Sequence, residues 1–142
     1  MSSKVKIEFE GFDEILNRLS KLNGDTIKTT EKALKDSQKH INEKLHKEMK
    51  KHKLTGATEK SIVEEQKVRW FGTEAEIDIG FDISEGGLAS IFLMHGTKGT
   101  PRHAPTKQDK KLFSALYGSE TRKEIQKIQE DIFYEEIRRL DK

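Results

Sequence analysis

Hydrophobic and polar residues alternate in two regions of the chain, and both regions are predicted to form strands. Near the N-terminus, Val5, Ile7 and Phe9 are separated by charged residues, which is the period-2 pattern of a half-buried strand. Residues 62–71 and 74–81 lie on either side of Gly72-Thr73 and form a second alternating region. This region predicts an antiparallel hairpin whose acidic residues occupy one solvated face.

Helical spacing of apolar residues covers most of the remaining chain. It predicts a short helix over residues 12–22 and a long one over 25–52. The stripe of the long helix is thin and consists of Ile27, Leu34, Ile41, Leu45 and Met49. Two further stripes predict C-terminal helices; they consist of Leu112, Phe113, Leu116 and Tyr117, and of Ile125, Ile128, Ile132, Ile137 and Leu140.

The most apolar stretch, Leu88 to Met94, is predicted to be buried as a third strand, although its periodicity fits a buried helical turn equally well. The sequence therefore predicts one α+β domain over residues 1–142, with a long N-terminal helix packed on a small antiparallel sheet. Its parts are a strand and helices (5–52), a hairpin and third strand (53–94), a cationic Gly/Pro loop (95–111) and C-terminal helices (112–142).

The cationic loop is the strongest functional candidate in the sequence. Both prolines of the protein fall within it. Proline fixes φ and donates no backbone hydrogen bond, so this segment is expected to be neither helix nor central strand. Loops held out from a scaffold tend to carry function, while an ordinary connection between two elements is the open alternative. The candidate assembly residues are Gly96, Thr97, Lys98, Gly99, Pro101, Arg102, His103 and Pro105.

Charge is distributed in blocks although the net charge is only +2. Residues 28–53 contain nine Lys and four acids (net +5), and residues 64–85 contain seven acids and two bases (net −5). Opposite blocks suit head-to-tail contact between copies of a chain, although ordinary solvated faces show such runs as well. The residues predicted to make charge contacts between copies are Lys44, Lys47, Lys50, Lys51, Glu74 and Glu76.

Motifs for catalysis, cofactors or metals are absent from the sequence. There is no Cys, phosphate-binding loop, dinucleotide-binding glycine pattern or nucleophile motif. His40, His46 and His52 are six residues apart and so point in three directions from a helix. His95 and His103 alone would make a weak metal site. We therefore predict no enzyme, no cofactor and no metal. No stretch reaches the length of a bilayer span, so we expect no membrane contact and synthesis in a cytoplasm.

Nucleic-acid binding is the alternative function. The basic helix 28–53 and the cationic loop both offer the positive charge that phosphate contact requires. Trp70 and Phe71 lie in the acidic region, so no platform for base stacking is evident. Such a module would bind without sequence specificity.

Three segments together resemble the tail-completion, or head–tail joining, family of long-tailed bacteriophages. Residues 11–16 are similar to its opening glycine and amphipathic turn. Residues 54–62, with Thr55, Gly56 and Ser61, are similar to its T-G-x-L-x-x-S-I segment. Residues 92–97 and the proline-bearing loop after them resemble its apolar-Glu-x-Gly-Thr run. The order agrees roughly from Phe9 to Tyr117.

The sequence departs from the family pattern at several positions. Lys53-Leu54 replaces a frequent Pro before the T-G pair, Thr58 replaces the leucine, and Met94 replaces the usual Glu. The Arg-Pro-Phe ending of the loop is also absent.

The resemblance implies a virion structural protein of the phage neck, without catalysis or cofactor. It implies a six-fold ring of copies around the DNA channel, joining the head connector or stopper to the tail terminator or tail tube proteins. Non-specific contact with the DNA in that channel is also expected.

Overall fold

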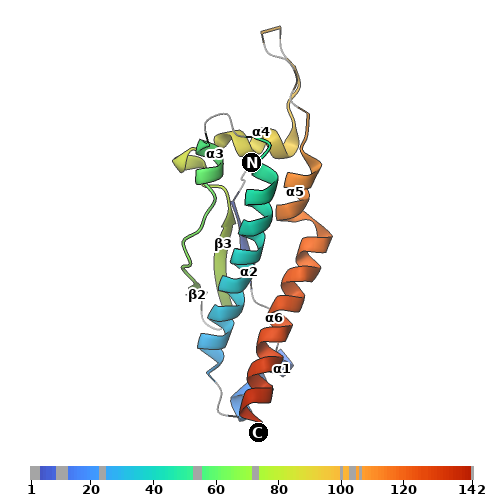
Figure 1. The fold of residues 1–142 in the computed structure, drawn as a ribbon. Coiled ribbons are helices and arrows are strands. Elements are labelled where there is room, and N and C mark those ends of the chain that lie inside the picture. Colours follow the sequence, from blue (N-terminus) through green and yellow to red (C-terminus); the bar gives the residue numbers. More distant parts are fainter. Residues whose placement is uncertain are drawn as a thin grey trace.

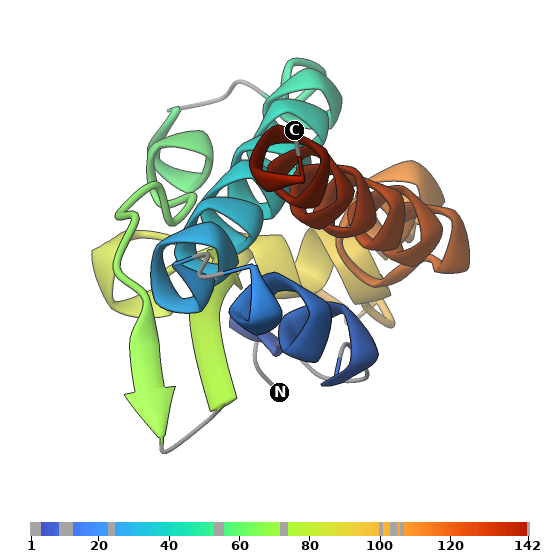
Figure 2. The same cartoon turned by 90° about the horizontal axis from the view of Figure 1, so that it is seen from below.

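A computed structural model describes residues 4–8, 13–22, 25–52, 56–71, 74–99, 101–102, 105 and 107–141. The α+β prediction is confirmed: the long helix α2 packs against the sheet strand β3 and against helix α6. These elements run along the length of the molecule, while α3, α4 and α5 lie across one end of it (Figure 1). Seen along its length, the body places the sheet and α6 around α2 (Figure 2).

The elements follow one another in the order β1 (Lys4–Glu8), α1 (Asp13–Lys21), α2 (Thr26–Met49), α3 (Ala57–Lys60), β2 (Arg69–Phe71), β3 (Glu74–Gly80), the 3-10 turn η1 (Ile83–Glu85), α4 (Leu88–His95), α5 (Lys110–Tyr117) and α6 (Ser119–Leu140). No helix in the described part of the chain is both long and apolar enough to cross a membrane.

The sheet has the strand order β1-β3-β2, and both pairings are antiparallel. Val5 lies opposite Ile79, and Trp70 lies opposite Ala75. The strand predicted near the N-terminus and the predicted hairpin are therefore both present, and the N-terminal strand supplies the third member of the sheet.

The third strand predicted for Leu88 to Met94 is wrong, because this stretch is the helix α4. Strand β3 already pairs with β1 on one side and β2 on the other. Gly80 and Gly86 both have positive φ, 105° and 100°, and turn the chain away from the sheet between β3 and α4. A helix satisfies its backbone hydrogen bonds internally, so this stretch needs no place in the sheet.

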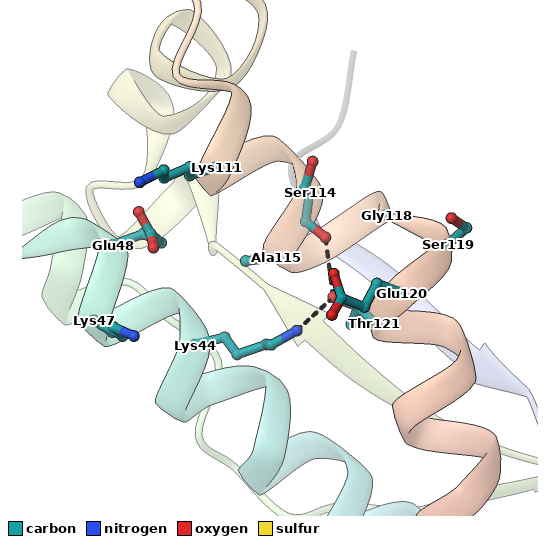
Figure 3. Close-up of a pocket in the computed structure, with 10 residues that line it drawn as sticks. All are labelled: Lys44, Lys47, Glu48, Lys111, Ser114, Ala115, Gly118, Ser119, Glu120 and Thr121. Carbon is teal, nitrogen blue, oxygen red and sulfur yellow. Dashed lines mark hydrogen bonds between the residues drawn. The ribbon is translucent and has the colours of Figure 1, made fainter.

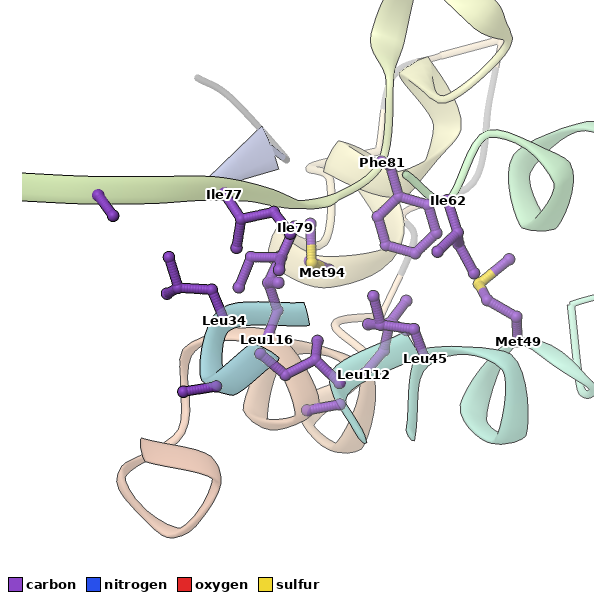
Figure 4. Close-up of a cluster of buried hydrophobic side chains, with 14 of the residues drawn as sticks. Leu34, Leu45, Met49, Ile62, Ile77, Ile79, Phe81, Met94, Leu112 and Leu116 are labelled. Atoms are coloured by element: carbon purple, nitrogen blue, oxygen red, sulfur yellow. The ribbon is translucent and has the colours of Figure 1, made fainter. Parts of the chain in front are cut away.

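Helix α2 supplies one side of the core. Asp25 caps its N-terminus, where the carboxylate accepts from the Lys28 N–H at 2.9 Å. The buried hydrophobic cluster joins α2 to β3 and closes against α4 and α5 (Figure 4); its labelled members are Leu34, Leu45, Met49, Ile62, Ile77, Ile79, Phe81, Met94, Leu112 and Leu116. Ile27, although predicted in the α2 stripe, is 59% exposed.

The buried face of α2 is wider than its apolar stripe and includes polar residues. Gln38 is 1% exposed, and its side-chain amide donates to the carbonyls of Glu65 (3.1 Å) and Asp78 (2.8 Å). Asn42 donates to the Val63 carbonyl at 3.1 Å. These amides explain why the strand predicted from residue 62 to 71 is regular only over Arg69–Phe71: α2 side chains occupy backbone acceptors that a strand ladder would otherwise use.

The prediction that the hairpin acids share a solvated face is wrong for two of them. Glu76 is 8% exposed and accepts from Arg69 Nε at 3.1 Å. Asp78 accepts from both terminal nitrogens of Arg69, at 2.7 and 3.1 Å. Glu64, Glu65 and Glu74 are exposed as predicted. Burial of a carboxylate costs less free energy when a guanidinium group is paired with it than when it is isolated. The alternating sequence pattern does not reveal this pairing with Arg69.

The two C-terminal helices form where predicted, and α6 packs along α2. Phe133, which is outside the predicted stripe, is completely buried, whereas Ile125, Ile128 and Ile132 are half-buried. Buried polar groups also join the two helices: Gln129 donates to Ser37 Oγ at 3.3 Å.

We predict that Gln38→Met destabilises the protein by about 1–3 kcal/mol, because the backbone carbonyls of Glu65 and Asp78 lose the donor that this buried side chain supplies, while the side-chain volume stays similar. Urea denaturation measures the change. The matched control is Gln126→Met on the exposed side of α6, which should shift stability by less than about 0.5 kcal/mol. Equal losses in the two variants would contradict the bridging role of Gln38.

Candidate functional site

The candidate assembly loop begins where α4 ends. Gly96 adopts φ 74°, and its N–H donates to the Phe92 carbonyl at 2.8 Å. Beyond this point the chain leaves the body and extends past α4 before returning to α5 (Figure 1). The described members Lys98, Gly99, Pro101, Arg102 and Pro105 are exposed, and Thr97 is half-buried. His103 lies outside the described residues.

The returning end of the loop is held by Asp109. Its carboxylate caps α5, accepting from the N–H groups of Lys111 (3.1 Å) and Leu112 (3.0 Å). Its own N–H donates to the Leu93 carbonyl of α4 at 2.8 Å. Asp109 thus ties α4 to the start of α5, directly below the projecting segment.

A second set of contacts joins Asp109 to the end of α2. His52 Nε2 lies 2.6 Å and Lys51 Nζ 3.5 Å from Asp109 Oδ2. Burial alone would raise the pKa of Asp109, but the hydrogen bonds from His52 and the Leu112 N–H outweigh it and lower that pKa. Asp109 is not among the residues predicted for the loop, although an Asp directly before a helical stripe is a recognisable capping signal.

The outgoing end of the loop is also in contact with α5. The rings of His95 and Phe113 meet edge to face, with centroids 5.5 Å apart and planes at 76°. Both ends of the loop are therefore attached to α5, and α5 is packed on α2. The loop thus starts and finishes on fixed elements.

The lysines predicted to make charge contacts have different surroundings. Lys44 donates to Thr121 Oγ1 at 3.1 Å and pairs with Glu124. Lys51 pairs with Glu48 at 3.0 Å in addition to Asp109. Lys47 and Lys50 are exposed. Of the predicted acidic partners, Glu74 is exposed, whereas Glu76 is buried against Arg69 and so does not lie on the outer surface.

A cleft of about 400 Å³ separates α2 from the junction of α5 and α6 (Figure 3). Lys44, Lys47 and Lys111 line it, together with Glu48 and Glu120. Cationic and anionic groups alternate around this opening, so the cleft does not present the single-signed surface that phosphate binding favours.

His40 and His46 of α2 and His52, three residues beyond its end, contact three different places. His40 contacts Glu124 at 2.8 Å, His52 contacts Asp109, and His46 contacts Glu59 and Glu64 at 3.0 and 2.7 Å. Within the described residues, no group of three or more potential metal ligands gathers at one point.

His46 holds three elements together. It lies on α2, Glu59 lies on α3, and Glu64 belongs to the extended segment before β2. Burial opposes the charged imidazolium, but the hydrogen bonds to Glu59 and Glu64 prevail and raise the pKa of His46 above its ordinary value.

One of the three segments that carry the family resemblance, residues 54–62, connects α2 to the sheet. Thr55 lies outside the described residues. Gly56 has φ 75° and precedes α3. Ser61 is buried; its hydroxyl donates to the Thr58 carbonyl at 2.6 Å, and its carbonyl accepts from the Asp82 N–H at 2.8 Å. This segment ties α3 to the chain that follows β3.

An exposed apolar surface adjoins the loop, and the sequence pattern predicted the opposite. Leu88 is 54% and Phe92 47% exposed, although the stretch that contains them was predicted to be buried. They are four residues apart and share one side of α4. Ile83 of η1 is 37% exposed. We name Ile83, Leu88 and Phe92 the α4 face.

Comparison of the chain with protein-family models, with curated proteins and with solved structures finds no match.

We predict that His46→Gln lowers thermal stability in a pH-dependent way. A histidine whose pKa is raised on folding stabilises fully below its unfolded pKa of about 6.5. This stabilisation fades as the pH rises through the higher folded value. The melting temperatures of wild type and variant should therefore differ at about pH 5.5 and converge near pH 9. Lys47→Gln, at an exposed position on the same helix, is the control. A gap independent of pH would contradict the proposed ion pairs.

We predict that Asp109 controls access to the base of the loop. Asp109→Asn keeps a capping side chain but loses the charge opposite His52 and Lys51, and Asp109→Ala loses the cap as well. Trypsin cleavage after Lys107 should accelerate in the order wild type, Asn variant, Ala variant, as followed by mass spectrometry. Cleavage after Lys127 on α6 is the internal control. Equal rates after Lys107 in all three proteins would show that Asp109 does not restrain the loop.

Proposed function

We propose that this chain is a structural protein of the phage neck, forming a ring that joins the head connector to the tail around the DNA channel. In this proposal the chain is a virion component with homo-oligomeric contacts, six-fold by the family resemblance, and with protein partners on both sides. It performs no catalysis and uses no cofactor.

The observation that carries the proposal is a cationic segment that projects from the body and is attached at both ends. Lys98 and Lys107 are exposed within it, and Asp109 and the His95–Phe113 contact fix its two ends. Pro101 and Pro105 restrict its backbone, which reduces the ordering entropy that is lost on docking. A segment built in this way is suited to capture by a partner.

The arrangement of the family-like segments also supports the proposal. The segment with Gly56 and Ser61 lies between the long helix and the sheet, and the run 92–97 leads directly into the projecting loop. Two of the family-like segments are also in contact, because α3, which lies between Gly56 and Ser61, packs on α4.

Nucleic-acid binding by the basic helix receives less support. Lys44 and Lys51 are paired with carboxylates of the same chain, and acidic residues line the cleft beside them. Phosphate binding depends on unneutralised positive charge, so these pairs weaken the alternative. Exposed Lys47 and Lys50 remain available for incidental contact with DNA in the channel.

We predict that Pro101→Gly combined with Pro105→Gly impairs the joining of heads to tails while leaving the fold intact. Both prolines are exposed, so thermal unfolding should change by less than about 0.5 kcal/mol. The added flexibility should weaken docking. Thermal melting and a count of joined particles in a complementation assay measure the two effects.

A charge variant with a matched control accompanies this test. Lys98→Ala with Arg102→Ala should also reduce joining, whereas Lys123→Ala with Lys127→Ala, on the exposed side of α6, should not. If the loop variants join particles as well as wild type does, the loop is an ordinary connection and the proposal loses its main support.

A further inference from the structure

The α4 face is an apolar surface that the chain leaves uncovered. Leu88 and Phe92 lie on one side of a helix, and Ile83 lies in the turn just before it. Burial of apolar area is the main favourable term in association, and exposed apolar residues that gather in one place mark contact sites. The exposed side chains of Ile83, Leu88 and Phe92 are therefore expected to be covered by a partner.

The loop of the same chain projects beyond α4 and does not run back along this helix (Figure 1). It leaves the body at Gly96, the residue that ends α4, and extends past α4 instead of folding back over it (Figure 1). Asp109 and the His95–Phe113 contact hold both of its ends to α5. A loop that reaches the α4 face must therefore come from another copy.

The charges of the loop and of the region around the α4 face are opposite in sign, which favours contact between them. Residues 70–97 contain no Lys or Arg but five acids. Arg69 binds two of these acids, Glu76 and Asp78. Glu85 is exposed in η1, beside Ile83. The loop supplies the opposite sign through Lys98, Arg102 and Lys107 and offers the exposed apolar rings of Pro101 and Pro105.

We propose that the projecting loop of one copy docks on the α4 face of a neighbouring copy. Its prolines cover Leu88 and Phe92, and its basic residues meet Glu85. A loop of twelve residues, the length of 96–107, can reach at most roughly 20 Å from its base when both of its ends are anchored. This reach exceeds the width of a helix, about 10 Å, so the loop can cross α4 of a neighbour.

The geometry of this contact makes it head-to-tail. The donating loop and the receiving α4 face are different surfaces, so each copy can give one contact and receive one, and such contacts close into a ring when the rotation permits. A single loop on a short helix buries less than the roughly 800 Å² per partner of a standard interface. Each contact is therefore weak, and the isolated protein is expected to be monomeric until closure or a template adds contacts.

Paired cysteines test the contact, because the natural chain contains no Cys. One population carries Gly99→Cys in the loop, and a second carries Ala89→Cys beside Leu88 on α4; both positions are exposed. The two singly substituted proteins are mixed, concentrated and treated with a short bismaleimide. Only a contact between copies can join the two populations. The control replaces Ala89→Cys with Arg138→Cys near the end of α6, which lies at the opposite end of the body (Figure 1).

We expect several-fold more heterodimer from the pair Gly99→Cys and Ala89→Cys than from the pair Gly99→Cys and Arg138→Cys. Adding Glu85→Lys to the Ala89→Cys protein should lower that yield, and adding Lys98→Glu and Lys107→Glu to the loop protein should restore it. Thermal melting of each variant verifies that it is folded. The same cross-linking is repeated in particles assembled from both populations.

The inference rests on the proposed ring, yet the two can fail separately. Cross-links between loop and α4 face in purified protein, without any effect of the variants on particle joining, would support the contact and count against the neck function. Coupling of Gly99→Cys only to a different virion protein would overturn the contact and leave the neck function standing. No heterodimer in either preparation, or equal yields with Ala89→Cys and Arg138→Cys, would also overturn the contact.

Discussion

The packing of α2 on β3 is the constraint on which the rest of the structure depends. The apolar residues of α2 cover Ile77, Ile79 and Phe81, while Gln38 supplies hydrogen bonds to backbone carbonyls on both sides of the hairpin. One helix face thus buries the sheet and replaces part of its ladder. With only 32% apolar residues in the chain, this double use of α2 allows a small core to hold a three-stranded sheet, and α6 then covers another side of α2.

The sequence predicts the elements whose signals are local. Helical periodicity and the Asp25 cap identify α2, and alternation identifies β1 and β3. The errors arise where a distant partner decides the outcome. Arg69 makes burial of Glu76 possible, and β1, from the N-terminal end of the chain, takes the place beside β3 that a third strand would need. Periodicity also says nothing of whether an apolar side is covered within the same chain, so the exposure of Leu88 and Phe92 could not be predicted.

In the candidate site, too, some features follow from local sequence and others depend on residues that are distant in the chain. Its exposed Gly, Pro and basic residues follow from composition, because such a segment cannot join a helix or a central strand. Its attachment does not follow, because Asp109 acts through His52, which lies 57 positions earlier in the chain. The carboxylate connects the ends of α2 and α4 with the start of α5. A loop of simple composition thereby acquires a definite direction from contacts that are distant in sequence.

Charged groups paired within the chain and apolar side chains exposed at the surface lie in different parts of the molecule. Several basic groups on α2 and just after it are used within the chain, since Lys44, His46 and His52 all contact carboxylates of other segments. At the end that bears α4, the apolar side chains of Leu88 and Phe92 remain exposed, and the cationic loop projects beyond that helix (Figure 1). The exposed residues Leu88 and Phe92 lie outside the buried cluster, so the α4 face can be altered with little effect on the core.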